Sequence, residues 1–349
     1  MLTIDGSFGE GGGQVLRTCL SLAAITGTDV RIAGIRASRK NPGLAAQHLT
    51  SVRATAAVCG GMVEGDRLGS QELVFRPRGC HAGQYVFDVT DIQPSAGSVN
   101  LVLQTVLPIL AQCDGPSEVT LRGGTHVAWS PTFDYVADVF LPAVAEFGVR
   151  AETELRKSGH YPKGGGEEVL RIGAGGPWRA VNFGSARGEL RCRLTSRASC
   201  LPRHVIERQL SAMKTELRGV CSRMEEIAED TPGIAPGTAA MVATLPGMGG
   251  WAGCTALGAR GKPAEAVGRE AAQAFRAFVE SGAAVDRHLA DQLLLYAALA
   301  EGATVLAVEE ITEHARTNMW VIEQFIGPRF QVEEPAEGKP ARIAVSGRG

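Results

Sequence analysis

The feature that most constrains the fold is a pattern of two helices and several short strands that recurs about three times along the chain. Apolar periodicity and end signals predict three helix pairs, at residues 14–25 and 44–58, 98–112 and 133–147, and 287–299 and 316–325. Because each sheet must bury one face, we predict an α/β (α+β) fold of three repeated units, each with two helices on a four-stranded sheet. The short β-rich runs that would form these sheets lie at residues 2–4, 30–35, 72–75, 85–89, 118–121, 149–155, 168–172, 304–308, 330–332 and 341–345.

Residues 184–278 break this pattern. They contain a predicted strand at 189–194, a charged helix at 204–217, a Pro/Gly-rich passage, a strand at 239–243 and a helix at 263–279. This self-contained set separates the third helix pair from the other two. We therefore expect a large domain from residues 1–183 plus 279–349, and a small inserted α/β domain at 184–278. The alternative is a two-domain chain that divides near residue 185.

Composition narrows the class of protein. Of the 349 residues, 44% are hydrophobic and 21% are charged, a balance typical of globular proteins. The 44 glycines lie in short clusters, which favours tight turns over a collagen-like repeat. The net charge is −2, so overall charge does not indicate a nucleic-acid partner, and any RNA would have to bind in a local basic cleft.

Cysteines and apolar runs bear on location. The eight cysteines show no CxxC and no spacing with histidine of the kind that binds structural zinc. We recognise no signal peptide, and no apolar run approaches the ~20 residues that span a bilayer. We expect reduced thiols, no membrane partner and a soluble, cytoplasmic protein, while no sequence feature indicates an oligomeric state.

Two segments near the amino terminus could bind an anion. Gly9-Glu10-Gly11-Gly12-Gly13-Gln14 lies between a predicted strand and a helix, where free N–H groups and the helix dipole attract phosphate, and Arg17 follows one turn later. It is neither a Walker loop nor a dinucleotide GxGxxG, and a purely structural turn is the alternative. The second segment carries Arg36, Arg39 and Lys40, followed by Gln47-His48. These residues suit a phosphate cluster, although a solvated basic loop has the same composition.

Two segments near the carboxyl terminus carry further polar residues. Asp291-Gln292 interrupts a long apolar helix, where the pair is either a satisfied core group or part of a cleft. Glu313-His314 follows a predicted strand and opens a helix. A neutral imidazole at such a junction can attack phosphorus, although a lone histidine is more often structural.

Together these segments resemble the RNA 3′-terminal phosphate cyclase family, and the resemblance runs nearly from end to end. Several long motifs in the same order make it much more specific than any one of them. The motifs are Asp5-Gly-Ser-Phe-Gly-Glu-Gly-Gly-Gly-Gln-Val-Leu-Arg17, Arg36-Ala-Ser-Arg-Lys-Asn-Pro-Gly-Leu, Gln47-His48, Ser95-Ala-Gly, Leu103-Gln104-Thr-Val-Leu-Pro108, Gly123-Gly-Thr125, Gly159-His-Tyr-Pro-Lys-Gly-Gly-Gly166, Leu289-Ala-Asp-Gln292 and His314.

The resemblance implies three repeated α/β units with a small insert, and a three-step reaction. His314 would attack the α-phosphate of ATP, AMP would pass to an RNA 3′-phosphate, and the vicinal 2′-OH would then displace it. It also implies Mg²⁺ or Mn²⁺ as cofactor, with Glu10 near the metal. The other residues implied to bind ATP or phosphates, or to orient the nucleotide, are Gln14, Arg17, Arg36, Arg39, Gln47, His48, Gln104, Asp291 and Gln292, with Pro131, Tyr135 and His288 near the adenine. His288 stands where some members place a tyrosine, which weakens the expectation of adenine stacking.

Three alternatives stay open at this point. Lys40-Asn-Pro-Gly43 superficially matches the KxxG of lysine-dependent nucleotidyltransferases, but the acidic residue usual before that glycine is missing. A non-catalytic, cyclase-like scaffold for RNA processing would lack the histidine that is present here. An enolpyruvyl-transferase-like enzyme could share the repeated fold, but the His314 segment does not favour it.

Overall fold

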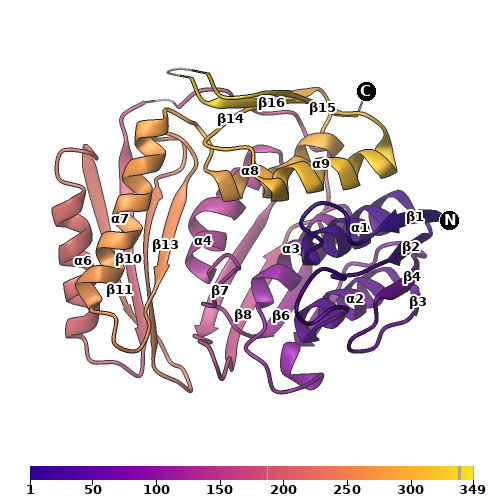
Figure 1. Ribbon diagram of the computed structural model, residues 1–349, viewed down its shortest axis with the longest axis horizontal. Coiled ribbons are helices and arrows are strands. Elements are labelled where there is room, and N and C mark those ends of the chain that lie inside the picture. Colours follow the sequence, from indigo (N-terminus) through magenta and orange to yellow (C-terminus); the bar gives the residue numbers. More distant parts are fainter. Residues whose placement is uncertain (187, 337–338, 349) are drawn as a thin grey trace.

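The computed structural model describes residues 1–186, 188–336 and 339–348, which form four four-stranded sheets and the helices that cover them (Figure 1). Arg187, which falls in the predicted insert, lies outside the described residues, as do Glu337, Gly338 and Gly349 in the predicted large domain. Among the described helices, none is long and apolar enough to cross a membrane.

The first unit sets the topology that the others repeat. Its sheet has the order β1-β2-β4-β3, with β1 and β2 parallel and the other pairs antiparallel. Helices α1 and α2 pack together, and each ends at a glycine in the left-handed conformation, Gly27 and Gly60. The elements are β1 (Leu2–Asp5), α1 (Gly13–Thr26), β2 (Val30–Ala33), α2 (Ala46–Cys59), β3 (Met62–Glu64) and β4 (Glu72–Arg76).

The second unit has the equivalent order β5-β6-β8-β7, again with only the first pair parallel. The helix expected at 133–147 is interrupted by a π turn, because Pro142 has no N–H for the regular ladder and the Leu141 N–H bonds to Val136, five residues back. The elements are β5 (Gln84–Asp88), a 3₁₀ turn (Val89–Asp91), α3 (Val99–Leu110), β6 (Ser117–Gly123), α4 (Phe133–Tyr135), the π turn (Val136–Phe140), α5 (Leu141–Glu146), β7 (Ala151–Lys157) and β8 (Gly166–Ile172).

The third unit is split by the segment that breaks the pattern. Its first strand, β9 (Asn182–Phe183), pairs in parallel with β14 from much later in the chain, giving the order β9-β14-β16-β15. The remaining elements are α8 (Arg287–Leu299), β14 (Ala303–Val308), α9 (Glu313–Ile326), β15 (Phe330–Glu333) and β16 (Ala341–Ser346). The predicted fold of three repeated α/β units is therefore confirmed.

The intervening segment has a different strand order, β11-β10-β12-β13, and a hydrophobic core of its own. Leu194, Met213, Val242 and Phe275 are all buried in this core. Strand β11 is rich in charge and lies at the edge of the sheet, so apolar periodicity missed it. The elements are β10 (Arg191–Ser199), α6 (His204–Glu216), β11 (Arg223–Asp230), β12 (Gly237–Thr244), β13 (Gly253–Leu257) and α7 (Ala264–Ser281).

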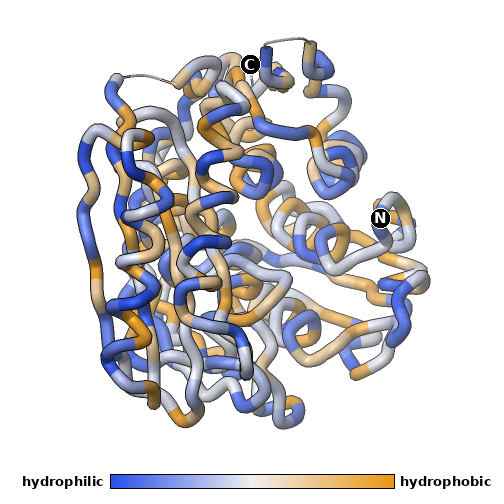
Figure 2. Tube along the Cα trace, turned by 60° about the vertical axis from the view of Figure 1, so that its left-hand side comes forward, coloured by the Kyte–Doolittle hydropathy of each residue, from blue (hydrophilic) through white to orange (hydrophobic). Residues whose placement is uncertain are grey.

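A second and larger core joins the three repeated units. It includes Leu20 and Phe75 from the first unit, Leu107 and Phe140 from the second, and Leu293 from the third. Figure 2 shows apolar stretches along helices and strands inside the fold and hydrophilic stretches in many peripheral loops. Helix α1 packs against α2, α3 and α9, so this shared core brings the helices of all three units together.

Candidate active site

His314 lies in the first turn of α9 and contacts the glycine-rich loop. Thr312 caps this helix, its hydroxyl accepting from the Ala315 N–H at 3.0 Å. The Nε2 of His314 is 3.0 Å from Glu10 Oε2, and Arg39 Nη2 approaches the same carboxylate oxygen at 3.4 Å. The fold thus brings together three of the segments that the sequence singled out.

The surroundings of His314 favour its neutral form. Burial lowers the pKa of His314, Glu10 opposes that effect, and the positive charges of Arg17 and Arg39, with His288, lower the pKa further. The side chain nevertheless stays 44% exposed. A neutral and accessible imidazole is the form that can act as a nucleophile.

The loop before α1 requires glycine because a Cβ atom at these positions would collide with neighbouring side chains. A Cβ at Gly13 would collide with the His48 ring and lie 2.9 Å from Arg17 Nη1. A Cβ at Gly9, whose φ is +61°, would collide with Thr317 Oγ1 on α9. The loop therefore passes directly over His48, Arg17 and α9.

Arg17 and His48 form the floor beneath that loop. Arg17 Nη2 donates to Gln14 Oε1 at 2.6 Å, and burial lowers the pKa of Arg17 to about 10, so it remains a cation at neutral pH. Burial, followed by Arg17 and Arg36, lowers the pKa of His48 to about 3. His48 Nδ1 accepts from the Ala45 N–H at 3.3 Å, which leaves the Nε2 proton facing Gly13.

Arg36, Lys40 and Gln47, which the sequence placed in or just after a basic loop, have different contacts. Arg36 has a φ of +53° and donates to the Gly43 carbonyl at 2.7 Å, so it braces its own loop. Burial and the charge of Arg39 lower the pKa of Arg36. Gln47 accepts from the Ser98 N–H at 2.9 Å, which joins the start of α2 to that of α3. Lys40 is exposed.

Helices α3 and α8 close the site from the other side. Gln104 Nε2 donates to Gln292 Oε1 at 2.7 Å, and both residues line a cavity of about 40 Å³ together with Gln14 and Arg17. Burial raises the pKa of Asp291 to about 8, although Arg17 opposes this. Four predicted residues from helices of three different units therefore border one cavity.

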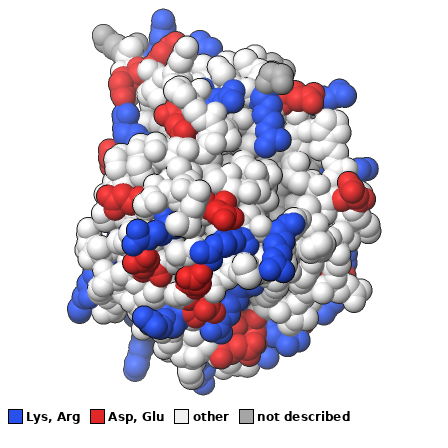
Figure 3. Space-filling view, turned by 90° about the vertical axis from the view of Figure 1, so that its right-hand side faces the viewer, with Lys and Arg blue, Asp and Glu red and all other residues white. Residues whose placement is uncertain are grey.

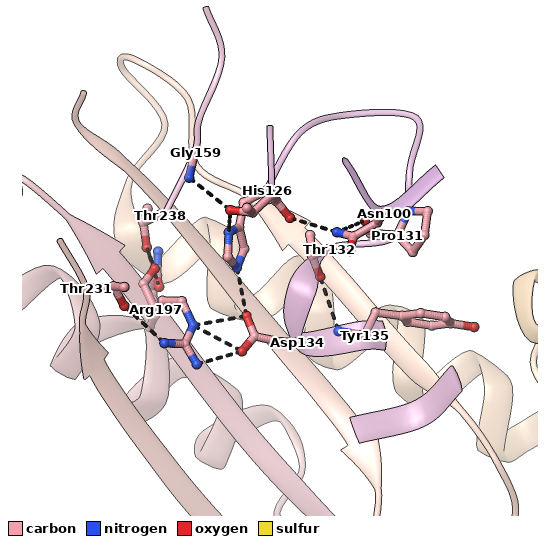
Figure 4. Close-up of polar contacts among 12 residues, drawn as sticks. Asn100, His126, Pro131, Thr132, Asp134, Tyr135, Gly159, Arg197, Thr231 and Thr238 are labelled. Atoms are coloured by element: carbon pink, nitrogen blue, oxygen red, sulfur yellow. Dashed lines mark hydrogen bonds and ion pairs between the residues drawn. The ribbon is translucent and has the colours of Figure 1, made fainter. Parts of the chain in front are cut away.

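The three residues predicted near the adenine form hydrogen bonds with other groups of the described chain. The Pro131 carbonyl accepts from Asn100 at 3.0 Å (Figure 4), and the Tyr135 hydroxyl is hydrogen-bonded to Asp286. The His288 N–H also donates to Asp286, at 2.8 Å, while its side chain is exposed. Sequence reasoning missed Asp286, although an aspartate directly before a helix is a recognisable N-cap signal.

Glu10 is the residue at this site whose chemistry suits a metal ion. No group of three or more His, Cys, Asp or Glu residues able to hold a metal occurs in the described part of the chain. Glu10, 32% exposed, offers one carboxylate at the mouth of the site. Mg²⁺ in phosphate-transfer sites is commonly held by one or two carboxylates and the substrate phosphates, so this single donor suffices.

The fold and site together define an α/β protein with a histidine set among arginines at converging helix amino termini. Residues 8–332 match the family model described as RNA 3′-terminal phosphate cyclase. A protein of that name from Trichormus variabilis is 48% identical over 93% of this chain and 94% of its own length. Others of the same name, from Methylococcus capsulatus and Pyrobaculum neutrophilum, are 48% and 42% identical, covering 93% and 99% of this chain and 91% and 98% of their own lengths.

These matches identify the family. The chain belongs to the RNA 3′-terminal phosphate cyclase family and is an enzyme of the ligase type. Among solved structures, the enolpyruvyl transferase NikO from Streptomyces tendae aligns with 99% of this chain and 48% of its own, at 11% identity and a TM-score of 0.39. That likeness is too weak to support an argument about function.

Proposed function

We propose that the protein uses ATP to convert an RNA 3′-phosphate into a 2′,3′-cyclic phosphate through a covalent His314–AMP intermediate. The observation that carries this proposal is His314 itself, half-exposed at the mouth of the site, where burial and the positive charges of Arg17 and Arg39 lower its pKa. Lys40, the rival nucleophile, lies exposed in a loop.

The first step is adenylylation of the histidine. A ring nitrogen of His314 forms a bond to the α-phosphorus of ATP as the bond to pyrophosphate breaks. Gln14, Arg17, Arg36, Arg39, Gln47, His48 and Gln104 would hold the phosphates. Asp291 and Gln292 would orient the nucleotide against Pro131, Tyr135 and His288. Fixed donors of this kind stabilise charge on the transferred group without having to reorganise during the step.

Glu10 has a different role when the nucleotide is bound. It would supply the protein ligand for Mg²⁺ or Mn²⁺, which would neutralise charge on the phosphate oxygens. In the structure Glu10 instead contacts His314 and Arg39.

Two further steps complete the reaction. A 3′-phosphate oxygen of the RNA displaces His314 from the adenylyl phosphorus, giving RNA-(3′)pp(5′)A. The 2′-oxygen then attacks the 3′-phosphorus, loses its proton, and AMP leaves. The neighbouring hydroxyl is held beside the phosphorus, where effective molarities reach ~10⁵ M or more.

A terminal 2′-deoxy RNA tests this sequence of steps. An oligonucleotide with a 3′-phosphate but no vicinal 2′-OH should accept AMP and accumulate as the pyrophosphate-linked species, a slower band on a gel. The ribose-ended control should pass through that species and finish as a cyclic phosphate resistant to phosphatase. Cyclisation of the ribose end without ATP, by a protein that never adenylylates the deoxy end it binds, would contradict the mechanism.

The insert and the cellular location belong to the proposal as well. The separate core around Leu194 and Phe275 supports residues 184–278 as an inserted domain that does not carry the chemistry. The eight cysteines are all unpaired, which supports a reducing, cytoplasmic environment.

A further inference from the structure

One motif has no role in the proposed reaction, the turn Gly159-His-Tyr-Pro-Lys-Gly-Gly-Gly166 between β7 and β8. The base of this turn is tightly packed. A Cβ at Gly159 would collide with the Gly123 carbonyl, and one at Gly166 would lie 2.7 Å from Thr125 Cγ2. At Gly164, with φ +64°, a Cβ would lie 2.9 Å from the Ser95 carbonyl. The glycines are therefore explained by packing, whereas the tip of the turn is not.

The tip displays an aromatic ring and a cation to solvent. Tyr161 is 78% exposed, and Pro162 and Lys163 beside it are exposed too. Because the base of the turn is fixed, these side chains project from a rigid support. A rigid support of this kind lets side chains bind a ligand without first having to be ordered.

A second exposed aromatic lies in the adjacent loop. Trp129 is 99% exposed and has a φ of +63°, a conformation that bulky residues rarely adopt. The two loops are joined because the Gly159 N–H donates to Thr125 Oγ1 at 2.9 Å and the Gly159 carbonyl accepts from the Thr125 and His126 N–H groups (Figure 4). We call Trp129, Tyr161 and Lys163 the aromatic rim.

The aromatic rim is close to the candidate site along the chain and in space. Trp129 precedes Pro131 by two residues, and Asn100 at the start of α3 holds the Pro131 carbonyl. The turn packs against Ser95, three residues before Ser98, whose N–H donates to Gln47. The rim is thus carried by loops that pack near the starts of α2 and α3.

Single-stranded RNA has the groups that the residues of this rim can bind. Bases stack on aromatic side chains regardless of sequence, and a lysine pairs with the backbone phosphates. The net charge is −2, and Figure 3 shows acidic and basic side chains interspersed among the described residues on one face, without a broad basic surface. Binding of RNA would then depend on stacking, with few charge contacts.

We propose that the aromatic rim binds the nucleotides directly upstream of the RNA 3′-phosphate, with bases on Trp129 and Tyr161 and a phosphate on Lys163. This inference rests on the proposed function, because it assumes an RNA end at His314. The rim plays no part in the reaction with ATP alone.

The test compares substrates of different length in rim variants. Tyr161→Ala and Trp129→Asn remove the rings, asparagine being chosen because it tolerates positive φ. Tyr161→Phe keeps the ring, and Leu68→Ala changes an exposed apolar residue elsewhere in the fold. Three quantities are measured for each variant. The first is adduct formation from labelled ATP, and the second is AMP transfer to two substrates, a nucleoside 3′-phosphate and an RNA 3′-phosphate of about 10 nucleotides, a length that such surfaces span. The third is binding of the fluorescently labelled RNA without ATP, followed by anisotropy.

We expect Tyr161→Ala and Trp129→Asn each to weaken binding and raise the KM for the long RNA about tenfold, which is the loss of one stacked base. Adduct formation and transfer to the nucleoside 3′-phosphate should stay within about twofold of wild type, as should every readout in Tyr161→Phe and Leu68→Ala. Lys163→Ala should lower the slope of log affinity against log salt by about one.

Unchanged affinity for the long RNA in both ring variants would overturn the proposal. So would an equal loss on the long and the short substrate, which would show a general disturbance of the site. The experiment distinguishes failure of the rim proposal from failure of the proposed function. If wild-type protein binds RNA through the rim but forms no adduct with AMP, the rim proposal is supported and the proposed function is wrong.

Discussion

The hydroxyl of Tyr135 is 3.0 Å from both carboxylate oxygens of Asp286, so a residue of the second unit meets the cap of helix α8 in the third. Asp286 also accepts from the Gly253 N–H of the intervening segment at 3.0 Å. One buried carboxylate therefore joins three parts of the chain. Burial raises the pKa of Asp286, while hydrogen bonds to Leu289, Gly253 and Tyr135 oppose that effect.

Removing one donor from this carboxylate should be costly. Tyr135→Phe should lower the free energy of unfolding by about 1–3 kcal/mol, the range for a buried hydrogen bond to a charged group. Tyr85→Phe is the matched control, because the Tyr85 hydroxyl donates to the His81 carbonyl in an exposed position, and its effect should stay within about 0.5 kcal/mol. Urea unfolding measures both, and equal stability of the two variants would contradict the role given to Asp286.

The intervening segment is held to the second unit by a buried ion pair. Arg197 on β10 donates to Asp134 at 2.9 Å, and Asp134 also contacts His126 at 3.0 Å (Figure 4). Arg197→Met should lower stability by about 3–5 kcal/mol, because it leaves a buried carboxylate with one partner fewer. Arg208→Met breaks an exposed pair with Glu265 and should cost about 1 kcal/mol or less. If the two variants lower the melting temperature by similar amounts, the buried ion pair contributes no more to stability than the exposed one.

Glu168 should make stability fall with rising pH. It is fully buried, neither carboxylate oxygen has a hydrogen-bond partner among the residues that the structure describes, and burial raises its pKa to about 8. Between the ordinary pKa of 4.5 and about 8 the folded state binds more protons than the unfolded state, so the contribution is intact below pH 4.5 and is lost as pH rises toward 8. Glu168→Gln cannot titrate, so its free energy of unfolding should change less between pH 5 and 8. Parallel curves for the two proteins would refute the assignment.

Two glycine-to-alanine substitutions, one in the glycine-rich loop and one outside it, test the packing of the site. Gly13→Ala should abolish the AMP adduct, because the new Cβ collides with His48 and crowds Arg17. Gly176→Ala should have no effect, since no atom of the described part of the chain lies within 4 Å of its Cβ position. Circular dichroism should show both variants folded, and an active Gly13→Ala protein would mean that the loop does not lie over the phosphate-binding residues.

Arg17 should be needed as a planar donor rather than as a charge. Arg17→Lys keeps the charge but loses the fork that reaches Gln14, so the adenylylation rate should fall about tenfold or more, about 1.4 kcal/mol per decade. Arg53→Lys, at an exposed pair with Asp66, is the control. Near-wild-type single-turnover rates for Arg17→Lys would show that a general basic environment suffices.

Elements that are marked by a local pattern of apolar residues could be predicted from the sequence. Helix α8 has the predicted bounds, 287–299, because its apolar face is long and continuous. The two residues of β9 carry no periodicity, and their partner strand lies more than 100 residues away, so only the fold reveals them. The contact between Glu10 and His314 likewise depends on α1 and α9 packing together, which no local pattern encodes. The roles of the site residues remain predictions.

The most direct test of the central claim is to incubate the protein with ATP labelled at the α-phosphate, denature it and map the labelled peptide. We expect one AMP per chain on His314, and we expect this label to be lost in His314→Ala while that variant stays folded. Label on Lys40, or no label retained through denaturation by a folded wild-type protein, would contradict it.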